Sequence, residues 1–313
     1  MRIILISIFI PFILNSQNEK DIFTMFYNVE NFFDTINNPM TSDNEFLPNS
    51  KKKWGTYKYN QKIEQLTKIF SSINAGKKPN IIGLCEVENK NVIEDLLDNP
   101  FFNDHRYTII HNNSPDKRGI DCALLFDNNF KLLKKEFIRI DIPNARPTRD
   151  IVYVKLKLDN EILNIFVNHW PSRWGGQKET NHRRVITSKT LQQYINNHIN
   201  INEHIIIMGD LNDYASNESV KNIVSKNNFI NLTEWMKGDD AGSYNYKDEW
   251  NFIDHIIISN SLINKTPNFN TFKEEWMLYT NKNGIKYPSR TYSRNQWHGG
   301  FSDHLPIYCS FKL

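Results

Sequence analysis

Short runs of apolar residues, rich in Ile, Val, Phe and Tyr, recur along the chain and are typical of β-strands. They predict strands at residues 22–27, 80–85, 107–111, 121–126, 151–158, 162–168, 205–208, 256–259 and 306–311. Helical spacing, with apolar residues three or four positions apart, occurs from Ile63 to Ile73 and through residues 179–199. Shorter helices are expected at residues 89–97 and 217–226. Many strands with a few interleaved helices predict a layered α/β domain over about residues 20–313.

Two segments between the predicted elements show neither strand-like apolar runs nor helical spacing of apolar residues. Residues 36–56 and 261–300 are expected to form long loops or insertions. Loops of this length in a compact domain are often functional. The chain contains no internal repeat and no linker rich in Gly, Ser or Pro that would separate two domains.

Composition narrows the class of protein without identifying it. The 313 residues permit one large domain or two smaller ones. With 12 Gly, 12 Pro and 3 Cys, the chain is neither collagen-like nor low-complexity nor built on disulfides. The net charge of +3 argues neither for nor against a nucleic-acid partner. Asn occurs 43 times, about one residue in seven, so an isolated Asn is weak evidence for a site.

The N-terminus has the pattern of an export signal. Arg2 supplies a positive start, and residues 3–14 are apolar apart from Ser7 and Pro11. This stretch is shorter than the about 20 residues that a membrane-spanning helix needs, and it fits the apolar core of a signal peptide. We therefore expect a signal peptide at residues 1–16 and a secreted or periplasmic protein without a stable membrane anchor. The alternative is a buried first strand or helix.

The three cysteines, Cys85, Cys122 and Cys309, each lie in an apolar strand-like run. An odd and sparse set is not a disulfide framework, and none has the spacing of a metal site. We expect all three to be small buried residues.

Polar residues with metal-binding or acid–base chemistry occur at the ends of six apolar runs. Open sheets bind ligands at such strand ends, and a desolvated carboxylate without a partner costs several kcal/mol. A single acidic residue there is usually explained as a cap or an ion pair. Six such ends together suit a divalent cation with oxygen ligands and an imidazole that contacts phosphate. The residues are Asn28 and Glu30, Glu86 and Glu88, Asn168 and His169, Asp210 to Asp213, Asp254 and His255, and Ser302 to His304.

Other hydrolase classes lack their signatures in this sequence. There is no G-x-S-x-G nucleophile elbow and no P-loop. The segment GDLND is shared in part with calcineurin-like phosphatases, but their upstream D-x-H and downstream G-N-H elements are missing. The H-x-H-x-D-H of metallo-β-lactamase-type hydrolases is also absent.

The ordered motifs resemble those of the endonuclease/exonuclease/phosphatase superfamily. They are FYNVENFFD (26–34), GLCEVEN (83–89), NHWPSR (168–173), GDLND (209–213), NFIDHIIIS (251–259) and SDHLPIY (302–308). The motifs span nearly all of the chain after the export signal, so the resemblance implies one domain over residues 17–313. It also implies a four-layered α/β sandwich of two facing sheets flanked by helices, with the site at one mouth of the sandwich.

The resemblance assigns a role to most of these residues. Glu86 would bind Mg²⁺ or Mn²⁺, with Asn28 close by and Asp303 beside the metal. Hard oxygen ligands of this kind fit Mg²⁺. Glu30 is at a position where some relatives place Asp near the metal.

The same resemblance assigns the catalytic residues. Asp210 would orient and deprotonate the attacking water, and Asn212 would donate to the phosphate. His304 would contact the scissile phosphate with Asp254 as its carboxylate partner, which fixes the tautomer of the imidazole. His169 would stabilise or protonate the leaving side.

Arginines and a tryptophan near these motifs are further candidates. Arg118, Arg173 and Arg183 are expected to contact substrate phosphate, since Arg is suited to bidentate contact with phosphate. The alternative for each is a solvated or structurally paired side chain. Trp170 is expected to pack. His255 replaces the Arg that often follows Asp in nucleases and 5-phosphatases of this superfamily.

The leading hypothesis is an exported, metal-dependent phosphodiesterase, a nuclease that acts on DNA or RNA as a monomer. The alternative is a phosphatase or lipid phosphodiesterase that acts on a small phosphorylated substrate. A third hypothesis is a binding protein that kept the fold without catalysis. The presence of all the residues expected for catalysis argues against it, namely Glu86, Asp210, Asn212, Asp254, Asp303 and His304.

Overall fold

Two six-stranded sheets form the body of the protein in a computed structural model that describes residues 19–227 and 229–313. The predicted export signal, residues 1–16, lies outside the described residues. The strands of the first sheet are β1 (Asp21–Phe32), β2 (Ile81–Val87), β3 (Tyr107–His111), β4 (Asp121–Asp127), β13 (Asn268–Thr271) and β18 (Ile307–Lys312). Those of the second are β5 (Lys131–Ile138), β6 (Ile151–Leu158), β7 (Glu161–His169), β8 (His204–Asp210), β9 (Ile230–Asn231) and β12 (Asp254–Ile258).

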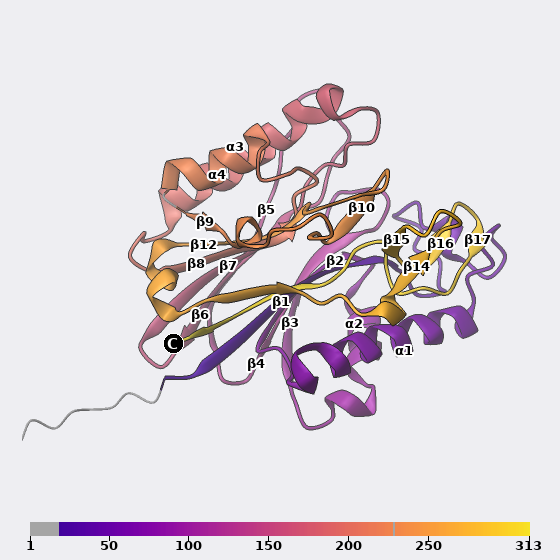
Figure 1. Cartoon of the computed structure of the whole chain (residues 1–313), viewed down its shortest axis with the longest axis horizontal. Helices are drawn as coiled ribbons and strands as arrows, with labels where there is room; N and C mark the ends of the chain where they lie inside the picture. The colour runs from indigo at the N-terminus through magenta and orange to yellow at the C-terminus, as the bar shows by residue number, and fades with distance from the viewer. Residues whose placement is uncertain (1–18, 228) are drawn as a thin grey trace, which may run out of the picture.

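The strand order is β13-β18-β1-β2-β4-β3 in the first sheet and β5-β6-β7-β8-β12-β9 in the second. In each sheet one central pair is parallel, β1 with β2 and β7 with β8. Helices α1 (Thr56–Ser72) and α2 (Lys90–Leu97) cover the outer face of the first sheet, and α3 (Gln177–His198) and α4 (Glu218–Asn227) cover that of the second (Figure 1). This arrangement confirms the predicted four-layered α/β sandwich.

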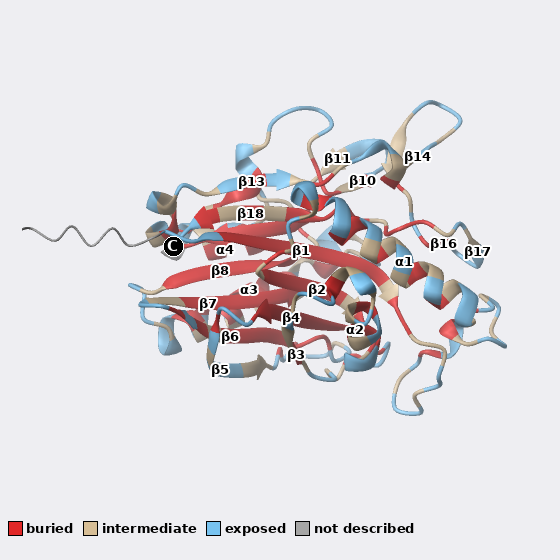
Figure 2. Cartoon of the chain, turned by 90° about the horizontal axis from the view of Figure 1, so that it is seen from below, coloured by how far each residue is buried: buried red, intermediate tan, exposed pale blue. Residues whose placement is uncertain are grey.

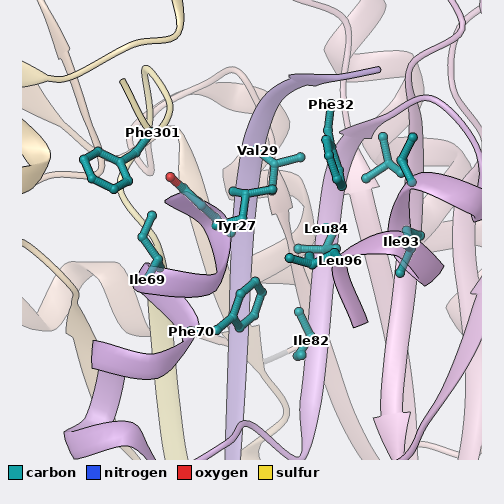
Figure 3. Packing of buried hydrophobic residues seen from close by; sticks show 14 of the residues in the cluster. Tyr27, Val29, Phe32, Ile69, Phe70, Ile82, Leu84, Ile93, Leu96 and Phe301 are labelled. Carbon is teal, nitrogen blue, oxygen red and sulfur yellow. The ribbon is translucent and has the colours of Figure 1, made fainter. Parts of the chain in front are cut away.

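The core forms three layers because strand residues alternate between the two faces of a sheet. Along β1, Ile22 and Phe26 pack between the two sheets, whereas Phe23 and Tyr27 pack against the helices. Figure 2 shows the central strands buried along most of their length. In Figure 3, Tyr27 lies with side chains of α1, α2 and β2 in the layer between the first sheet and its helices.

Three short hairpins lie at one end of the sandwich (Figure 1). They are β10 (Tyr244–Tyr246) with β11 (Glu249–Asn251), β14 (Leu278–Thr280) with β15 (Lys286–Pro288), and β16 (Tyr292–Ser293) with β17 (Gln296–Trp297). Short 3₁₀ turns occur at 44–46, 73–76, 100–102, 232–235, 260–265 and 275–277. The expectation that 261–300 is a long loop is therefore wrong in part, because this segment contains β13, two hairpins and two of these turns.

Other expectations about elements and burial can be checked directly. The predicted strands and helices are all present, with ends that differ by several residues, but β5, β9, β13 and the strands of the three hairpins were not predicted. All three cysteines are free and buried, as expected. Within the described part of the chain, no helix is both long and apolar enough to cross a membrane.

Candidate functional site

The candidate site lies where the inward faces of four strands become polar. Side chains two positions apart on a strand point to the same face, so the apolar layer between the sheets continues into the site. Asp210 pairs in register with both His169 and Asp254 across neighbouring strands. The inward residues Phe26, Val167, Met208 and Ile256 are followed or preceded, two positions away, by Asn28, His169, Asp210 and Asp254.

Distortions in β1 and β2 aim further polar residues at the same place. The register between the two strands shifts after Asn28, where Glu30 and Asn31 have φ of 48° and 50°. The register of β2 with β4 shifts at Glu86, which has φ of 63°. Such bulges turn side chains away from the regular alternation and are frequent next to active sites. The carboxylate of Glu86 therefore turns back to accept the Asn31 N–H, at 2.9 Å.

Asp210 is at the centre of the cluster. Its Oδ2 accepts a hydrogen bond from Asn28 Nδ2 at 3.1 Å and lies 3.6 Å from His169 Nε2 and 3.8 Å from His304 Nε2. Burial raises the pKa of Asp210 to about 7, with repulsion from Asp254 and Glu86 adding to it and the His304 imidazole opposing it. A carboxylate with this pKa can take up a proton near neutral pH.

His304 and Asp254 form a buried pair. The Nδ1 of His304 donates to Asp254 Oδ2 at 2.7 Å, and the Ser243 hydroxyl donates to the same oxygen at 2.5 Å. Burial opposes charging of the imidazole, but Asp254, Asp210 and Asp303 outweigh it and hold the pKa of His304 well above its usual value. His304 is therefore protonated at neutral pH and presents Nε2 as a donor toward Asp210. The ring of Tyr244 lies against the imidazole, with 4.9 Å between centroids.

His169 has the opposite protonation. Burial, and then the charges of Arg149, Arg118 and His304, hold the pKa of His169 well below its usual value. Its imidazole is therefore neutral at pH 7. This state fits the predicted stabilisation of a leaving group by hydrogen bonding better than the predicted donation of a full proton.

Asn212 follows Asp210 in a tight turn. Its N–H donates to Asp210 Oδ1 at 2.9 Å, and its side-chain amide donates to the Trp170 carbonyl at 3.1 Å. Asn212 has φ of 51°, a conformation that Asn tolerates better than most residues. Trp170 itself is fully buried, as expected.

The predicted metal residues Glu86, Asn28 and Asp303 surround this centre. Glu86 Oε1 lies 3.9 Å from His169 Nε2, and Asp303 Oδ1 lies 4.0 Å from His304 Nε2. The Asn28 oxygen accepts the Glu30 N–H at 3.0 Å, so the amide nitrogen of Asn28, and not its oxygen, faces Asp210. The other Asp303 oxygen accepts a 2.7 Å hydrogen bond from Arg290.

The residues present fit a divalent cation. Asp254 Oδ1 and His169 Nδ1 are buried and have no hydrogen-bond partner among the described residues. Ligand atoms of Asp210, Asp254 and His304 all lie within 4.8 Å of one another, and Glu86 adds a further carboxylate. Excess buried carboxylate with unsatisfied polar atoms is the environment that a cation and its waters stabilise.

The three predicted substrate arginines differ in their surroundings. Arg118 makes a two-point ion pair with Asp116, at 3.1 and 2.7 Å, yet keeps a half-exposed side chain near His169. Arg173 donates from Nε to the Asn212 carbonyl at 2.7 Å and from Nη2 to Asp213 at 3.2 Å. It therefore stabilises the turn that follows Asp210.

Arg183 lies on α3, half-buried. Its buried Nε has no partner among the described residues, and no contact joins it to the cluster around Asp210. Among the described residues, hydrogen bonds join Arg173 to the turn at Asn212, and Arg118 contributes to the electrostatics of His169, whereas no hydrogen bond or ion pair links Arg183 to the cluster. The substrate contacts of all three stay predictions.

Two charged neighbours of the site were not predicted from the sequence. Arg290 lies 3.5 Å from Glu30 and 2.7 Å from Asp303, and Lys62 is fully buried on α1, donating to Thr291 Oγ1 at 2.9 Å. Lys62 had one available signal, a charged residue beside Ile63 on a predicted apolar helix face. Arg290 had none, because it lies in a segment without a period.

His255 occupies its position for the fold. Its Nε2 donates to the Asp213 carbonyl at 2.9 Å, and its Nδ1 accepts from Asn231 at 3.0 Å. Burial lowers the pKa of His255 to about 4, so the ring is neutral. It holds the Asp213 carbonyl, directly after Asn212, in place.

Comparison with known families agrees with this geometry. The family model described as Endonuclease/Exonuclease/phosphatase family matches residues 23–312. The chain belongs to this family. It is thereby an enzyme that hydrolyses phosphate esters with the help of a divalent metal, and the cluster around Asp210 is where its chemistry-bearing residues meet.

Solved structures show the same fold at low sequence identity. A humanized D. rerio TDP2 carrying 14 mutations is 15% identical, with a TM-score of 0.60 over 93% of this chain and 98% of that chain. An endonuclease/exonuclease/phosphatase family protein from Bacteroides thetaiotaomicron is 12% identical, with a TM-score of 0.59 over 94% and 98%. The human Nocturnin catalytic domain is 17% identical, with a TM-score of 0.55 over 94% and 97%. A search of curated proteins found no significant match.

Proposed function

We propose that the protein is a nuclease that hydrolyses phosphodiester bonds of DNA or RNA with Mg²⁺ as its metal. The observation that carries this proposal is the arrangement of Asp210 between Asn28, His169 and His304 at the mouth of the two sheets. It supplies a proton acceptor, a charged donor and a neutral imidazole within a few ångströms.

Glu86 is the proposed principal metal ligand, with Asn28 and Asp303 beside it. Asp254 is proposed as the partner of His304, because its Oδ2 accepts from His304 and Ser243, which leaves its unpartnered Oδ1 for the metal or a metal-bound water. A Mg²⁺ ion bound there would polarise the phosphate and stabilise the charge that develops in the transition state.

Asp210 is the proposed general base. Its Oδ1 is held by the Asn212 N–H and its Oδ2 by Asn28, so the carboxylate has a fixed orientation toward an attacking water. Protonated His304 donates from Nε2 to a phosphate oxygen, and Asp254 keeps the ring charged and oriented. Neutral His169 lies across Asp210 and would hydrogen-bond the leaving oxygen.

Nucleic acid as the substrate is supported by one of the structural relatives. A D. rerio TDP2 complexed with a single-strand DNA product has a TM-score of 0.55 to this chain at 14% identity, over 93% of this chain and 98% of that one. The shared fold alone does not transfer that ligand. The half-exposed Arg118 beside His169 adds a positive group suited to a polyanion.

The test is hydrolysis by the purified protein of plasmid DNA, RNA and a panel of phosphomonoesters, each with Mg²⁺ and with EDTA. EDTA-sensitive nicking or degradation of nucleic acid is the expected result. If phosphate were released from a monoester and no nucleic acid were hydrolysed, the protein would be a phosphatase and not a nuclease. If His169→Ala and His304→Ala, correctly folded, kept near-wild-type turnover, the catalytic assignment would be wrong.

We also propose export with removal of residues 1–16, and a monomeric enzyme. N-terminal sequencing of protein recovered from the medium or the periplasm should begin at Gln17. Light scattering should give the mass of one chain. An intact N-terminus on cytoplasmic protein, or a dimer mass, would contradict the respective proposal.

A further inference from the structure

A cavity of about 540 Å³ lies beside the catalytic residues, under the hairpins β10–β11, β14–β15 and β16–β17. Figure 1 shows these hairpins together at one end of the sandwich. The volume is within the range of pockets that bind small organic groups, roughly 300–1,000 Å³. The residues that matter for its chemistry are Tyr244, Tyr279, Tyr287, Arg290, His298 and Asp303.

The cavity borders the catalytic centre through two of its lining residues. Tyr244 lines it and also places its ring 4.9 Å from that of His304. Asp303, another lining residue, directly precedes His304. A phosphate in contact with His304 would therefore have the group esterified to it at the mouth of this cavity.

Two of the lining tyrosines form a cross-strand pair. Tyr279 and Tyr287 are opposite each other in the β14–β15 register, so their side chains share one face of the hairpin. The Tyr287 hydroxyl donates to Asp248, and Asn245 Nδ2 donates to the Lys286 carbonyl at 3.0 Å. These two contacts fix β15 beside the β10–β11 hairpin, so the tyrosine pair is held by the fold.

Much of the Tyr279 side chain is accessible to a ligand. It remains 59% exposed although it is a large aromatic residue. Other lining groups, among them Asn281, Arg290 and Ser293, offer hydrogen bonds at the edge of the cavity. A cavity lined by three tyrosines and a histidine together with polar groups is suited to a flat heteroaromatic ring that also forms hydrogen bonds.

We propose that this cavity binds one unpaired nucleobase adjacent to the scissile phosphate, which makes single-stranded nucleic acid the preferred substrate. The inference rests on the proposed nuclease function and deepens it. A base can enter a pocket only when it is out of its stack and unpaired. Stacking of one base on aromatic side chains strengthens binding by roughly 10-fold to 100-fold.

The test compares the binding of two labelled strands of equal length and charge in EDTA, where no hydrolysis occurs. One is a single-stranded oligodeoxynucleotide, and the other is the same sugar–phosphate chain without bases. Fluorescence anisotropy should give a Kd about 10-fold lower for the strand with bases. Because both strands carry the same phosphates, repulsion from the carboxylates affects both equally.

Tyr279→Ala should bring the ratio of the two Kd values close to one. Tyr246→Ala is the matched control, because Tyr246 is exposed to a similar degree, 54%, on the neighbouring hairpin but does not line the cavity. It should keep the wild-type ratio. Circular dichroism and the melting temperature confirm that both variants fold.

Two further arms separate the possible sources of the base. A duplex of the same sequence should bind more weakly than the single strand, and a mononucleotide should compete only at much higher concentration. Tighter binding of the mononucleotide than of the strand would overturn single-stranded nucleic acid as the ligand.

Equal binding of the base-free strand, no binding of either strand, or an unchanged ratio in Tyr279→Ala would overturn the nucleobase site. Hydrolysis with Mg²⁺ is measured separately. Its absence on every nucleic acid would overturn the nuclease function, whatever the binding ratio, so the two failures are distinguishable.

Discussion

Asp254 is buried and accepts a hydrogen bond from His304, through which it is proposed to act. Asp254→Asn removes the negative charge that keeps the imidazole protonated, while it keeps the size of the side chain. We expect kcat to fall by roughly 10²-fold to 10⁴-fold with little change in KM, because the charged donor acts mainly in the transition state. Steady-state kinetics on the substrate found in the hydrolysis panel measures the effect.

The control for this substitution is Asp239→Asn, at an exposed position, which should keep wild-type kcat. A kcat of Asp254→Asn within threefold of wild type would show that the His304–Asp254 pair is structural. A raised KM at unchanged kcat would point to ground-state binding instead.

Glu88 provides a pH-dependent effect away from the catalytic cluster. Burial, and then repulsion from Asp34 and Asp43, raise the pKa of Glu88 to about 8, although its Oε2 accepts the Asp34 N–H. The folded protein therefore binds this proton more tightly than the unfolded chain. The resulting stability is fully present below about pH 4.5 and is lost as the pH rises through about 8.

Glu88→Gln keeps the hydrogen-bond acceptor and removes the titration. We expect the variant to gain on the order of 2 kcal/mol relative to wild type between pH 5 and pH 9. Urea unfolding at both pH values measures this difference. Parallel pH dependence of the two proteins would contradict the raised pKa of Glu88.

At the residue scale, the sequence was informative where an apolar run ends in polar residues. Asn28, His169, Asp210 and Asp254 were singled out for that reason, and the structure brings all four to one face of the two sheets. Arg173 could not, because nothing local distinguishes an arginine that contacts phosphate from one that binds the Asn212 carbonyl.

At the element scale, Lys62 connects α1 to the segment that carries the last two hairpins. Its ammonium donates to Thr291 Oγ1 at 2.9 Å and to the Phe301 carbonyl at 2.5 Å, with no solvent exposure. Lys62→Met leaves both acceptors and nearby Glu30 without this partner. We expect a loss of about 2–4 kcal/mol in the free energy of unfolding.

Lys68→Met, on an exposed position of the same helix over the Trp276 ring, should cost no more than about 1 kcal/mol. Chemical denaturation of the three proteins gives both values. Equal losses in the two variants would mean that the buried hydrogen bonds of Lys62 add nothing to the stability.

The elements that could not be predicted from the sequence lack a regular pattern of apolar residues. β5 has the sequence KLLKKEFI, in which lysines and a glutamate interrupt the apolar residues. These charges are suited to an edge strand, where they discourage pairing with other chains. The hairpins β14–β15 and β16–β17 are two or three residues per strand, too short for a pattern, and their position depends on tertiary contacts such as those of Lys62.

At the scale of the whole molecule, the two sheets bring buried acidic groups together at one end. Burial, and then repulsion from Asp303, raise the pKa of Glu30 to about 7, and burial also raises that of Asp210 to about 7. For both groups the stability is fully present below about pH 4 and is lost as the pH rises through about 7. Without a cation, the folded protein therefore becomes less stable toward pH 8.

A bound divalent cation offsets this repulsion and competes with protons for the same site. We therefore expect Mg²⁺ or Mn²⁺, added to EDTA-treated protein at about 100 times its Kd, to raise the melting temperature by roughly 3–8 °C at pH 8. The rise should be smaller at pH 6, where protons already neutralise part of the charge. Differential scanning calorimetry at both pH values measures it.

Glu86→Gln should abolish most of the rise, whereas Glu64→Gln, at an exposed position of α1, should leave it intact. An equal rise at both pH values would show that cation binding does not depend on the protonation of the buried carboxylates. An equal rise in Glu86→Gln would indicate that the cation is bound by Asp210, Asp254 and His304 instead of Glu86. The His304–Asp254 pair could then not act as a protonated donor, because a metal-bound imidazole is neutral.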